Sequence, residues 1–136
     1  MNTKELENKV KKITTALIYE KGYVCAIDML IKLDYLTTKN YEDWRFGKIE
    51  YLEKACKINL SKLSTINRTI KKIANDLKLE KSLTGYNQYG KGKKRRLIFS
   101  KSGDKNIENA YATHYLDKKR INELKTDKAP AYNMRS

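Results

Sequence analysis

The feature that most constrains this sequence is an amphipathic segment from Asn59 to Leu79. Apolar residues recur there mostly at gaps of three and four, so at about 100° per residue they fall on one stripe of an α-helix. Asn59 or Ser61 can accept hydrogen bonds from the first helical turn. The stripe consists of Leu60, Leu63, Ile66, Ile70, Ile73, Ala74 and Leu77. We predict a long helix over residues 59–79 whose apolar side packs on the core.

The pattern changes from helical to extended directly after this helix. Two runs of β-favouring residues, 83–89 and 95–101, flank a turn that contains Gly90 and Gly92. Glycine tolerates the positive φ angles that tight hairpin turns require. The pattern therefore predicts a β-hairpin over residues 83–101.

The rest of the chain is predicted to be helical, with a polar end. Before the long helix we predict helices over residues 4–20, within 24–36, from Thr37 or Thr38 to about Gly47, and over 49–56. After the hairpin we predict a helix over 106–116 and a polar, partly disordered C-terminal tail over 117–136. The predicted fold is mainly α with one β-hairpin (α+β), as a single domain over residues 1–116.

The net charge of +14 is concentrated in one part of the sequence. Residues 1–56 carry 10 Lys/Arg against 9 Asp/Glu, whereas residues 57–103 carry 13 against 2. Concentrating like charges costs free energy through self-repulsion, and a polyanionic partner relieves that repulsion. The charge distribution thus indicates a nucleic-acid partner.

Two absences in the sequence bear on location. No apolar stretch reaches the roughly 18 residues that a membrane span needs. The segment from Met1 to Lys12 mixes acidic and basic residues and lacks the apolar region of a secretory signal. We expect a cytoplasmic protein that is not secreted and has no membrane partner.

The polar side of the predicted long helix is the first candidate for contact with nucleic acid. It combines three cations with hydroxyl groups and an amide, opposite the apolar stripe. Arginine can pair with guanine and asparagine with adenine in the major groove of DNA, while lysines and hydroxyls contact phosphates. A polar helix face is often simply solvated, and that alternative stays open. The candidates are Ser61, Ser64, Thr65, Arg68, Lys71, Lys72 and Asn75.

The tip of the predicted hairpin is the second candidate. Five cations occur within six residues around its turn, and Gly92 lets the backbone approach a partner closely. Two tyrosines just before the turn can pack on a sugar or stack on a base. Lysines at a strand edge also prevent edge-to-edge aggregation, which accounts for part of this charge. The candidates are Tyr86, Tyr89, Lys91, Lys93, Lys94, Arg95 and Arg96.

The order of these elements, short helices followed by a long polar-faced helix and a basic hairpin, spans roughly Val24 to Ser100. It resembles the winged helix-turn-helix superfamily, in which the helix before the hairpin reads the major groove and the wing touches the backbone or minor groove. The resemblance implies wing contacts by residues 91–96 and groove contacts by Arg68, Lys71, Lys72 and Asn75. The extra helical run between Leu36 and Ile49 departs from that family. Residues 41–68 and 99–116 are also similar to small bacterial proteins, which implies no mechanism.

Catalysis and metal binding find little support in the sequence. His114 is the one histidine, and the acidic residues are scattered at no spacing typical of a nuclease metal site. Cys25 and Cys56 are 31 positions apart among apolar neighbours, which indicates two free, buried thiols rather than zinc ligands. We expect a protein that is not an enzyme and needs no metal or cofactor.

The sequence favours one function and leaves two alternatives open. We expect a double-stranded DNA-binding regulator of transcription or of a mobile element, with helix 59–79 in the major groove and residues 90–96 on the backbone. RNA is the alternative ligand if Tyr86 and Tyr89 stack on bases. An inhibitor or accessory factor of a nucleoprotein machine is the other alternative. Trp44 and its neighbours are typical interface anchors for such a role, although a lone tryptophan beside glycine is also typical of a core.

Overall fold

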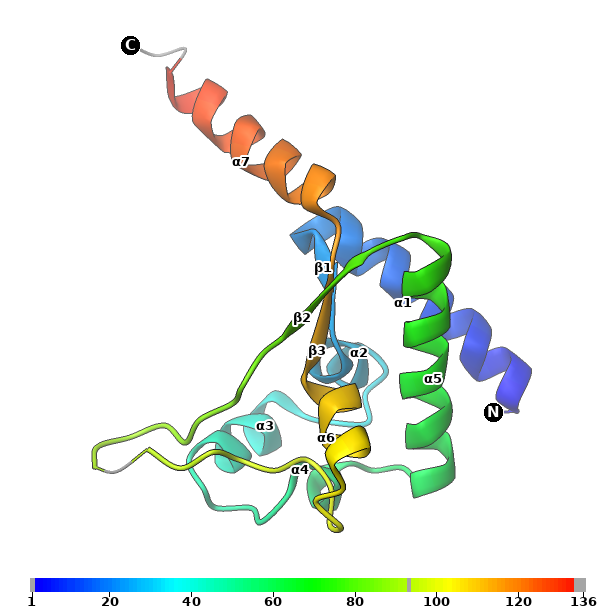
Figure 1. The fold of residues 1–136 in the computed structure, drawn as a ribbon, viewed down its shortest axis with the longest axis vertical. Helices are drawn as coiled ribbons and strands as arrows, with labels where there is room; N and C mark the ends of the chain where they lie inside the picture. Colours follow the sequence, from blue (N-terminus) through cyan, green and yellow to red (C-terminus); the bar gives the residue numbers. More distant parts are fainter. Residues whose placement is uncertain (1, 93, 134–136) are drawn as a thin grey trace.

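The structure, a computed structural model, describes residues 2–92 and 94–133. It is mainly α-helical with a small three-stranded antiparallel sheet, which confirms the predicted α+β class (Figure 1). None of the described helices is both long and apolar enough to cross a membrane. The elements in chain order are α1 (Thr3–Lys21), β1 (Tyr23–Val24), α2 (Ala26–Lys32), α3 (Thr38–Arg45), α4 (Leu52–Ala55), α5 (Leu60–Asp76), β2 (Glu80–Leu83), α6 (Lys105–Ala112), β3 (Thr113–Leu116) and α7 (Lys118–Asn133).

Helix α1 lies within one residue of the predicted range at each end. The side chain of Asn2 accepts a hydrogen bond from the backbone N–H of Glu5 at 2.8 Å, and Gly22 ends the helix with φ +84°. That left-handed conformation favours glycine, which has no Cβ. Helix α1 packs along α5 and buries Leu6, Val10 and Leu17.

The insertion between α2 and α5 contains two helices, α3 and α4, as the sequence predicts. Thr37 caps α3 by accepting a hydrogen bond from the backbone N–H of Asn40 at 3.0 Å. Trp44 of α3 is fully buried, and its indole Nε1 donates to the carbonyl oxygen of Ile98 at 2.9 Å. The tryptophan is therefore a core residue that joins the insertion to a distant part of the chain.

Helix α5 is shorter than the predicted range of 59–79 and buries the middle of the predicted apolar stripe, whereas Leu60 and Leu77, at the two ends of that stripe, are exposed. The side chain of Asn59 accepts a hydrogen bond from the backbone N–H of Lys62 at 2.9 Å and so caps the first turn. The helix ends at Asp76, and Lys78 adopts φ +56°, which turns the chain towards β2. The buried apolar residues of this helix are Leu63, Ile66, Ile70 and Ala74.

The three strands are ordered β1–β3–β2, and both pairings are antiparallel. Strand β2 pairs with β3 so that Glu80 lies opposite Leu116 and Leu83 opposite Thr113. Strand β1 pairs with the other edge of β3, with Tyr23 opposite Leu116. The partner of β2 is therefore a strand that follows α6, far along the chain.

The predicted β-hairpin over 83–101 forms only in part, because its two sides pair through one isolated bridge and the named strand β2 pairs with β3. Residues 84–92 and 94–99 form the two sides of a long arm, whose backbone has positive φ at Gly90 and Gly92 (Figure 1). Backbone hydrogen bonds of 2.8 Å and one isolated bridge between Asn87 and Arg96 join its two sides. The returning side does not extend the sheet: Leu97 and Phe99 are buried instead, and Phe99 packs on Trp44 of the insertion.

The predicted helix over 106–116 is wrong in its second half. Helix α6 ends at Ala112, and the residues that follow form β3. Thr113 is already extended, with ψ 125°, and Tyr115 is buried at the centre of the sheet. β-Branched and aromatic residues favour such half-buried strands. The free energy gained by pairing with β1 and β2 outweighs the helical preference of this segment. The spacing of apolar residues within the segment does not reveal this gain, because it depends on strands that are distant in sequence.

The predicted polar tail over 117–136 contains a helix that the sequence pattern does not indicate, α7 (Lys118–Asn133). The side chain of Asp117 accepts a hydrogen bond from the backbone N–H of Arg120 at 3.0 Å. The guanidinium of Arg120 donates to the Tyr19 carbonyl oxygen at 2.9 Å. These contacts anchor the first turn of α7 on α1, and Figure 1 shows the helix extending away from the sheet. Residues 134–136 lie outside the described part of the chain.

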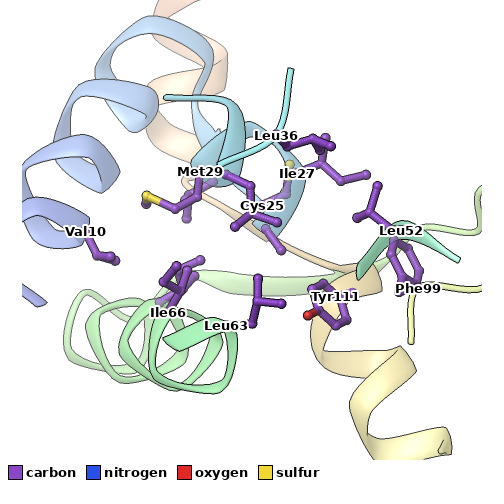
Figure 2. Packing of buried hydrophobic residues seen from close by; sticks show 14 of the residues in the cluster. Val10, Cys25, Ile27, Met29, Leu36, Leu52, Leu63, Ile66, Phe99 and Tyr111 are labelled. Atoms are coloured by element: carbon purple, nitrogen blue, oxygen red, sulfur yellow. The ribbon is translucent and has the colours of Figure 1, made fainter. Parts of the chain in front are cut away.

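One apolar core joins the helices and the sheet. In Figure 2, Val10 approaches Ile66 at one end of the core, and Leu52, Phe99 and Tyr111 gather at the other. The rings of Phe99 and Tyr111 are nearly parallel, and their centroids are 5.3 Å apart. This end of the core fixes α6 and the base of the arm beside α5, so it positions the candidate site.

The two cysteines are free, as the sequence predicts. Cys25 is buried in the core, whereas Cys56 is only half-buried and its Sγ contacts the Leu52 carbonyl oxygen at 3.5 Å. Burial raises the pKa of both thiols to about 12. Both side chains therefore stay protonated near neutral pH and act as packing groups.

Candidate nucleic-acid interface

The exposed face of α5 carries most of the predicted contact residues. Thr65 is a correction: it is 9% exposed, and its hydroxyl donates to the Ser61 carbonyl oxygen at 3.1 Å. Position 65 lies at the edge of the buried side of the helix, where a short hydroxyl finds a partner on the preceding turn. The predicted residues that are exposed are Ser61, Ser64, Arg68, Lys71, Lys72 and Asn75.

Helix α6 lies beside the first half of α5 and turns part of this face into a groove. The groove has a volume of about 920 Å³. Helix α5 contributes one wall with Leu60, Ser64, Asn67, Arg68 and Lys71. The other wall comes from α6 and the turn before it, with Lys101, Asn106, Ile107 and Ala110. Part of the predicted polar face of α5 therefore lines the groove, namely Ser64, Arg68 and Lys71. The rest of that face lies outside the groove, namely Ser61, Lys72 and Asn75.

The second wall of this groove was missed by reasoning from the sequence. Lys101 belongs to the same basic run as the arm, and the first half of α6 was predicted as a helix. Neither fact places these residues beside α5. The pairing of β2 with β3 brings α6 back to that position, and this contact connects residues about 30 positions apart.

One carboxylate holds the turn that carries Lys101. Glu108 accepts hydrogen bonds from the backbone N–H of Ser100 at 2.7 Å, from the hydroxyl of Ser100 at 2.7 Å and from the backbone N–H of Phe99 at 2.9 Å. Asp104 caps α6 by accepting hydrogen bonds from two backbone N–H groups, both at 3.1 Å. These bonds fix the backbone on either side of Lys101 at the mouth of the groove.

A second carboxylate lies at the floor of the groove. Glu53 accepts a hydrogen bond from the hydroxyl of Tyr111 at 2.7 Å. Burial, and then the hydrogen bond to Glu53, raise the pKa of Tyr111 far above its ordinary value, so the phenol stays protonated. This hydrogen bond joins Glu53 and Tyr111 at the floor of the groove. The cations Arg68, Lys71 and Lys101 line the groove around them.

Arg45 of α3 clamps the base of the arm. Its guanidinium donates two hydrogen bonds to the carbonyl oxygen of Asn87, at 3.0 and 3.3 Å, and one to the hydroxyl of Tyr41 at 2.9 Å. It also lies 3.9 Å from the ring centroid of Tyr89, a cation–π contact. The extra helix that departs from the winged-helix pattern therefore supports the arm.

The tip of the arm is basic, but two of its predicted cations are engaged within the arm. The Lys94 ammonium donates to the carbonyl oxygen of Gly90 at 2.7 Å, and the Arg96 guanidinium donates to the Asn87 side chain at 3.1 Å. The Arg96 guanidinium lies against Gly85, where a Cβ would come 2.5 Å from the guanidinium carbon, so a side chain at position 85 would force Arg96 to shift. Lys91 and Arg95 are exposed. Lys93 lies outside the described residues.

The two predicted tyrosines have different environments. Tyr86 is a correction: it is 7% exposed, packs on Trp44 and Phe99, and its hydroxyl lies 2.8 Å from Nε2 of His114. A residue this buried is part of the core and has no face free for a base. Tyr89 is 41% exposed, with one face on Arg45.

The structure divides the predicted contact residues into two groups. In Figure 1 the tip of the arm projects on the opposite side of the molecule from α5, with α3, α4 and α6 between them. The segment that returns from the tip passes through the uncharged residues 97–100 before it reaches Lys101, which lines the groove. The described basic residues of the tip and of α5 therefore lie in two separate regions.

Replacing Arg45 with alanine is expected to loosen the arm while the fold stays intact. Losing charged hydrogen bonds from a half-buried guanidinium should lower the free energy of unfolding by about 1–2 kcal/mol. Amide hydrogen exchange of Gln88 and Leu97, whose N–H groups bond across the arm, should become faster. Arg95→Ala, on the exposed tip, is the control. Unchanged exchange at both amides in the Arg45 variant would contradict the clamp.

His114 lies in a half-buried polar cluster at the base of the arm. Its ring stacks on Tyr23 with centroids 5.4 Å apart and meets the Tyr86 hydroxyl. Burial lowers the pKa of His114, and Lys21 adds to this effect, while Asp28 acts in the opposite direction. The neutral imidazole is therefore the form that fits the folded state, and it can accept a hydrogen bond from Tyr86.

The lowered pKa of His114 predicts that stability falls on acidification. A group whose folded-state pKa lies below its unfolded value of about 6.5 contributes stability above that pH and loses it as pH falls. Urea unfolding should give a smaller free energy at pH ~5 than at pH ~7.5. His114→Gln should reduce this difference, because glutamine does not titrate. An identical pH dependence in both proteins would show that other groups cause the loss.

The comparisons with known proteins give no further assignment. A scan against family models, a search of curated proteins and a search of solved structures found no match to this chain. The candidate interface therefore rests on the residues and geometry described above.

Proposed function

We propose that this chain binds double-stranded DNA without catalysis, with the exposed face of α5 in the major groove and the tip of the arm on the sugar–phosphate backbone. The observation that carries the proposal is the exposed set on α5, Arg68, Lys71, Lys72 and Asn75. Arginine and asparagine are the side chains that pair with guanine and adenine edges, and lysines contact phosphates. A helix also fits the width of the major groove.

The arrangement of carboxylates supports this proposal. Residues 57–103 carry two acidic residues, and these lie at the end of α5 and the start of β2. Glu53 in the groove lining and Glu108, which bonds to Ser100 of that lining, accept hydrogen bonds from neutral donors. Among the described residues, the salt bridges do not include Arg68, Lys71, Lys72 or Lys101, so these cations are available to a polyanion.

The topology adds support from the winged-helix resemblance. The long helix is followed by a strand, an arm with a basic tip, and a second strand that pairs with the first. In a winged helix the corresponding projection contacts the DNA backbone. Here the projection is longer and includes α6, and Arg45 holds its base, so we propose that the arm reaches a phosphate at a distance from the α5 contact. A role in regulating transcription or a mobile element fits such binding.

A salt series with a labelled duplex tests the proposal. We expect fluorescence anisotropy to show micromolar or tighter binding to a random duplex at ~50 mM salt, and a log–log salt slope of about −5 if about six phosphates are contacted. Matched single-stranded DNA and duplex RNA serve as competitors and should bind more weakly. Absence of duplex binding at ~50 mM salt would refute the proposal, and preference for RNA would favour the alternative ligand.

A further inference from the structure

The groove between α5 and α6 has an apolar component that duplex binding does not explain. Leu60 is 65% exposed at its α5 edge, and Ile107 is 42% exposed at its α6 edge. Ala110 also lines the groove and is exposed. Exposed aliphatic side chains that converge on one groove mark interaction sites more often than isolated ones do. A DNA backbone offers them little to pack on.

The rim of this groove is positively charged on both sides. Arg68 and Lys71 lie on the α5 wall, and Lys101 lies on the opposite wall. The carboxylate of Glu53 is at the floor and accepts the hydrogen bond from Tyr111. An occupant that suits this groove must combine apolar side chains with negative charges at its edges.

We propose that the groove between α5 and α6 binds an acidic amphipathic helix of a partner protein. Helices dock in grooves by laying apolar residues spaced i, i+3, i+4 and i+7 on the floor. Carboxylates beside that stripe would then meet Arg68, Lys71 and Lys101. A second copy of this chain is a poor occupant because each copy carries a net charge of +14.

The proposed partner shares two cations with the proposed DNA surface. Arg68 and Lys71 face the groove and also belong to the exposed face of α5. A helix in the groove therefore excludes duplex from α5, and a duplex on α5 excludes the helix. Binding of the helix itself does not depend on whether the chain binds DNA.

A synthetic peptide serves as the probe. It is an amphipathic peptide of about 18 residues, roughly five helical turns, with leucines along one stripe and glutamates on both sides of it. One control peptide replaces the leucines with serine and keeps the charge, and another replaces the glutamates with lysine. We expect the acidic leucine peptide to bind in fluorescence anisotropy, both controls to bind at least tenfold more weakly, and unlabelled duplex to displace it.

Matched protein variants locate the binding site. The Leu60→Gln/Ile107→Gln variant removes the apolar edges of the groove. The control is Leu83→Gln/Ile98→Gln, because Leu83 is 66% and Ile98 41% exposed, outside the groove. Burying two aliphatic side chains predicts about a tenfold loss of peptide affinity in the groove variant. The control variant should keep its peptide affinity, and both variants should keep their duplex affinity within about twofold.

Several outcomes would overturn this inference. They are no binding of the acidic leucine peptide, equal binding of its serine version, and equal loss of affinity in both protein variants. A groove variant that loses duplex affinity but not peptide affinity would assign the apolar edges to DNA instead. If the chain binds the peptide but no duplex, the proposed DNA function fails and the groove assignment stands.

Discussion

Replacing Arg68, Lys71 and Lys72 together with alanine is expected to weaken duplex binding about a thousandfold at ~50 mM salt. All three side chains are exposed on α5, so their removal should leave the core intact. A salt slope of about −0.9 per phosphate contact implies roughly 15-fold per contact between ~50 mM and a 1 M reference, so Lys71 and Lys72 together contribute about 200-fold and the base contact of Arg68 adds the rest. Because two phosphate contacts are lost, the same variant should show a slope that is less steep by about two.

The matched control removes the same charge from another helix. Lys9, Lys11 and Lys12 are exposed on α1, and their replacement with alanine lowers the net charge equally. Affinity and salt slope of that control should stay close to those of the unmodified protein. Equal losses in both triple variants would mean that total charge, and not the face of α5, governs binding.

The single change Arg68→Ala separates base contact from phosphate contact. An arginine paired with guanine should relax the preference for one sequence by about 1–3 kcal/mol. Lys91→Ala, at the tip of the arm, should weaken all sequences alike. Anisotropy with a selected and a random duplex distinguishes the two effects.

Replacing Trp44 with alanine is expected to lower the free energy of unfolding by about 3–5 kcal/mol. The indole is fully buried among Tyr41, Tyr86 and Phe99, with ring centroids 5.2 to 6.1 Å away. The change leaves a large cavity and also removes the donor to the Ile98 carbonyl oxygen. Because single domains are stable by about 5–15 kcal/mol, this loss is a large fraction of the total.

Urea unfolding followed by far-ultraviolet circular dichroism measures this effect. Phe46→Ala is the control, since Phe46 is two positions away and 48% exposed, and it should cost less than about 1 kcal/mol. If the alanine variant does not fold, Trp44→Phe keeps most of the packing and isolates the lost hydrogen bond. Equal stability of the Trp44 and Phe46 alanine variants would contradict a structural role for Trp44.

The site could be predicted from the sequence only in part. The exposed set on α5 follows from helical spacing, because a helix that buries one stripe must expose the opposite one. Thr65 and Tyr86 were assigned wrongly, because one lies at the edge of that stripe and the other is covered by an insertion distant in sequence. The Lys101 wall and the Arg45 clamp both depend on contacts between distant segments.

Local patterns in the sequence determined the helical content, the caps at Asn59 and Thr37, the inner face of α5 and the reversal of the chain at Gly90 and Gly92. These features arise from interactions within a few residues. Only the tertiary structure decided that residues 113–116 are a strand, that α7 is anchored on α1, and that α6 lies beside α5. Each of those outcomes depends on burial and pairing between segments far apart in the chain. The spacing of apolar residues within one segment therefore does not predict such contacts.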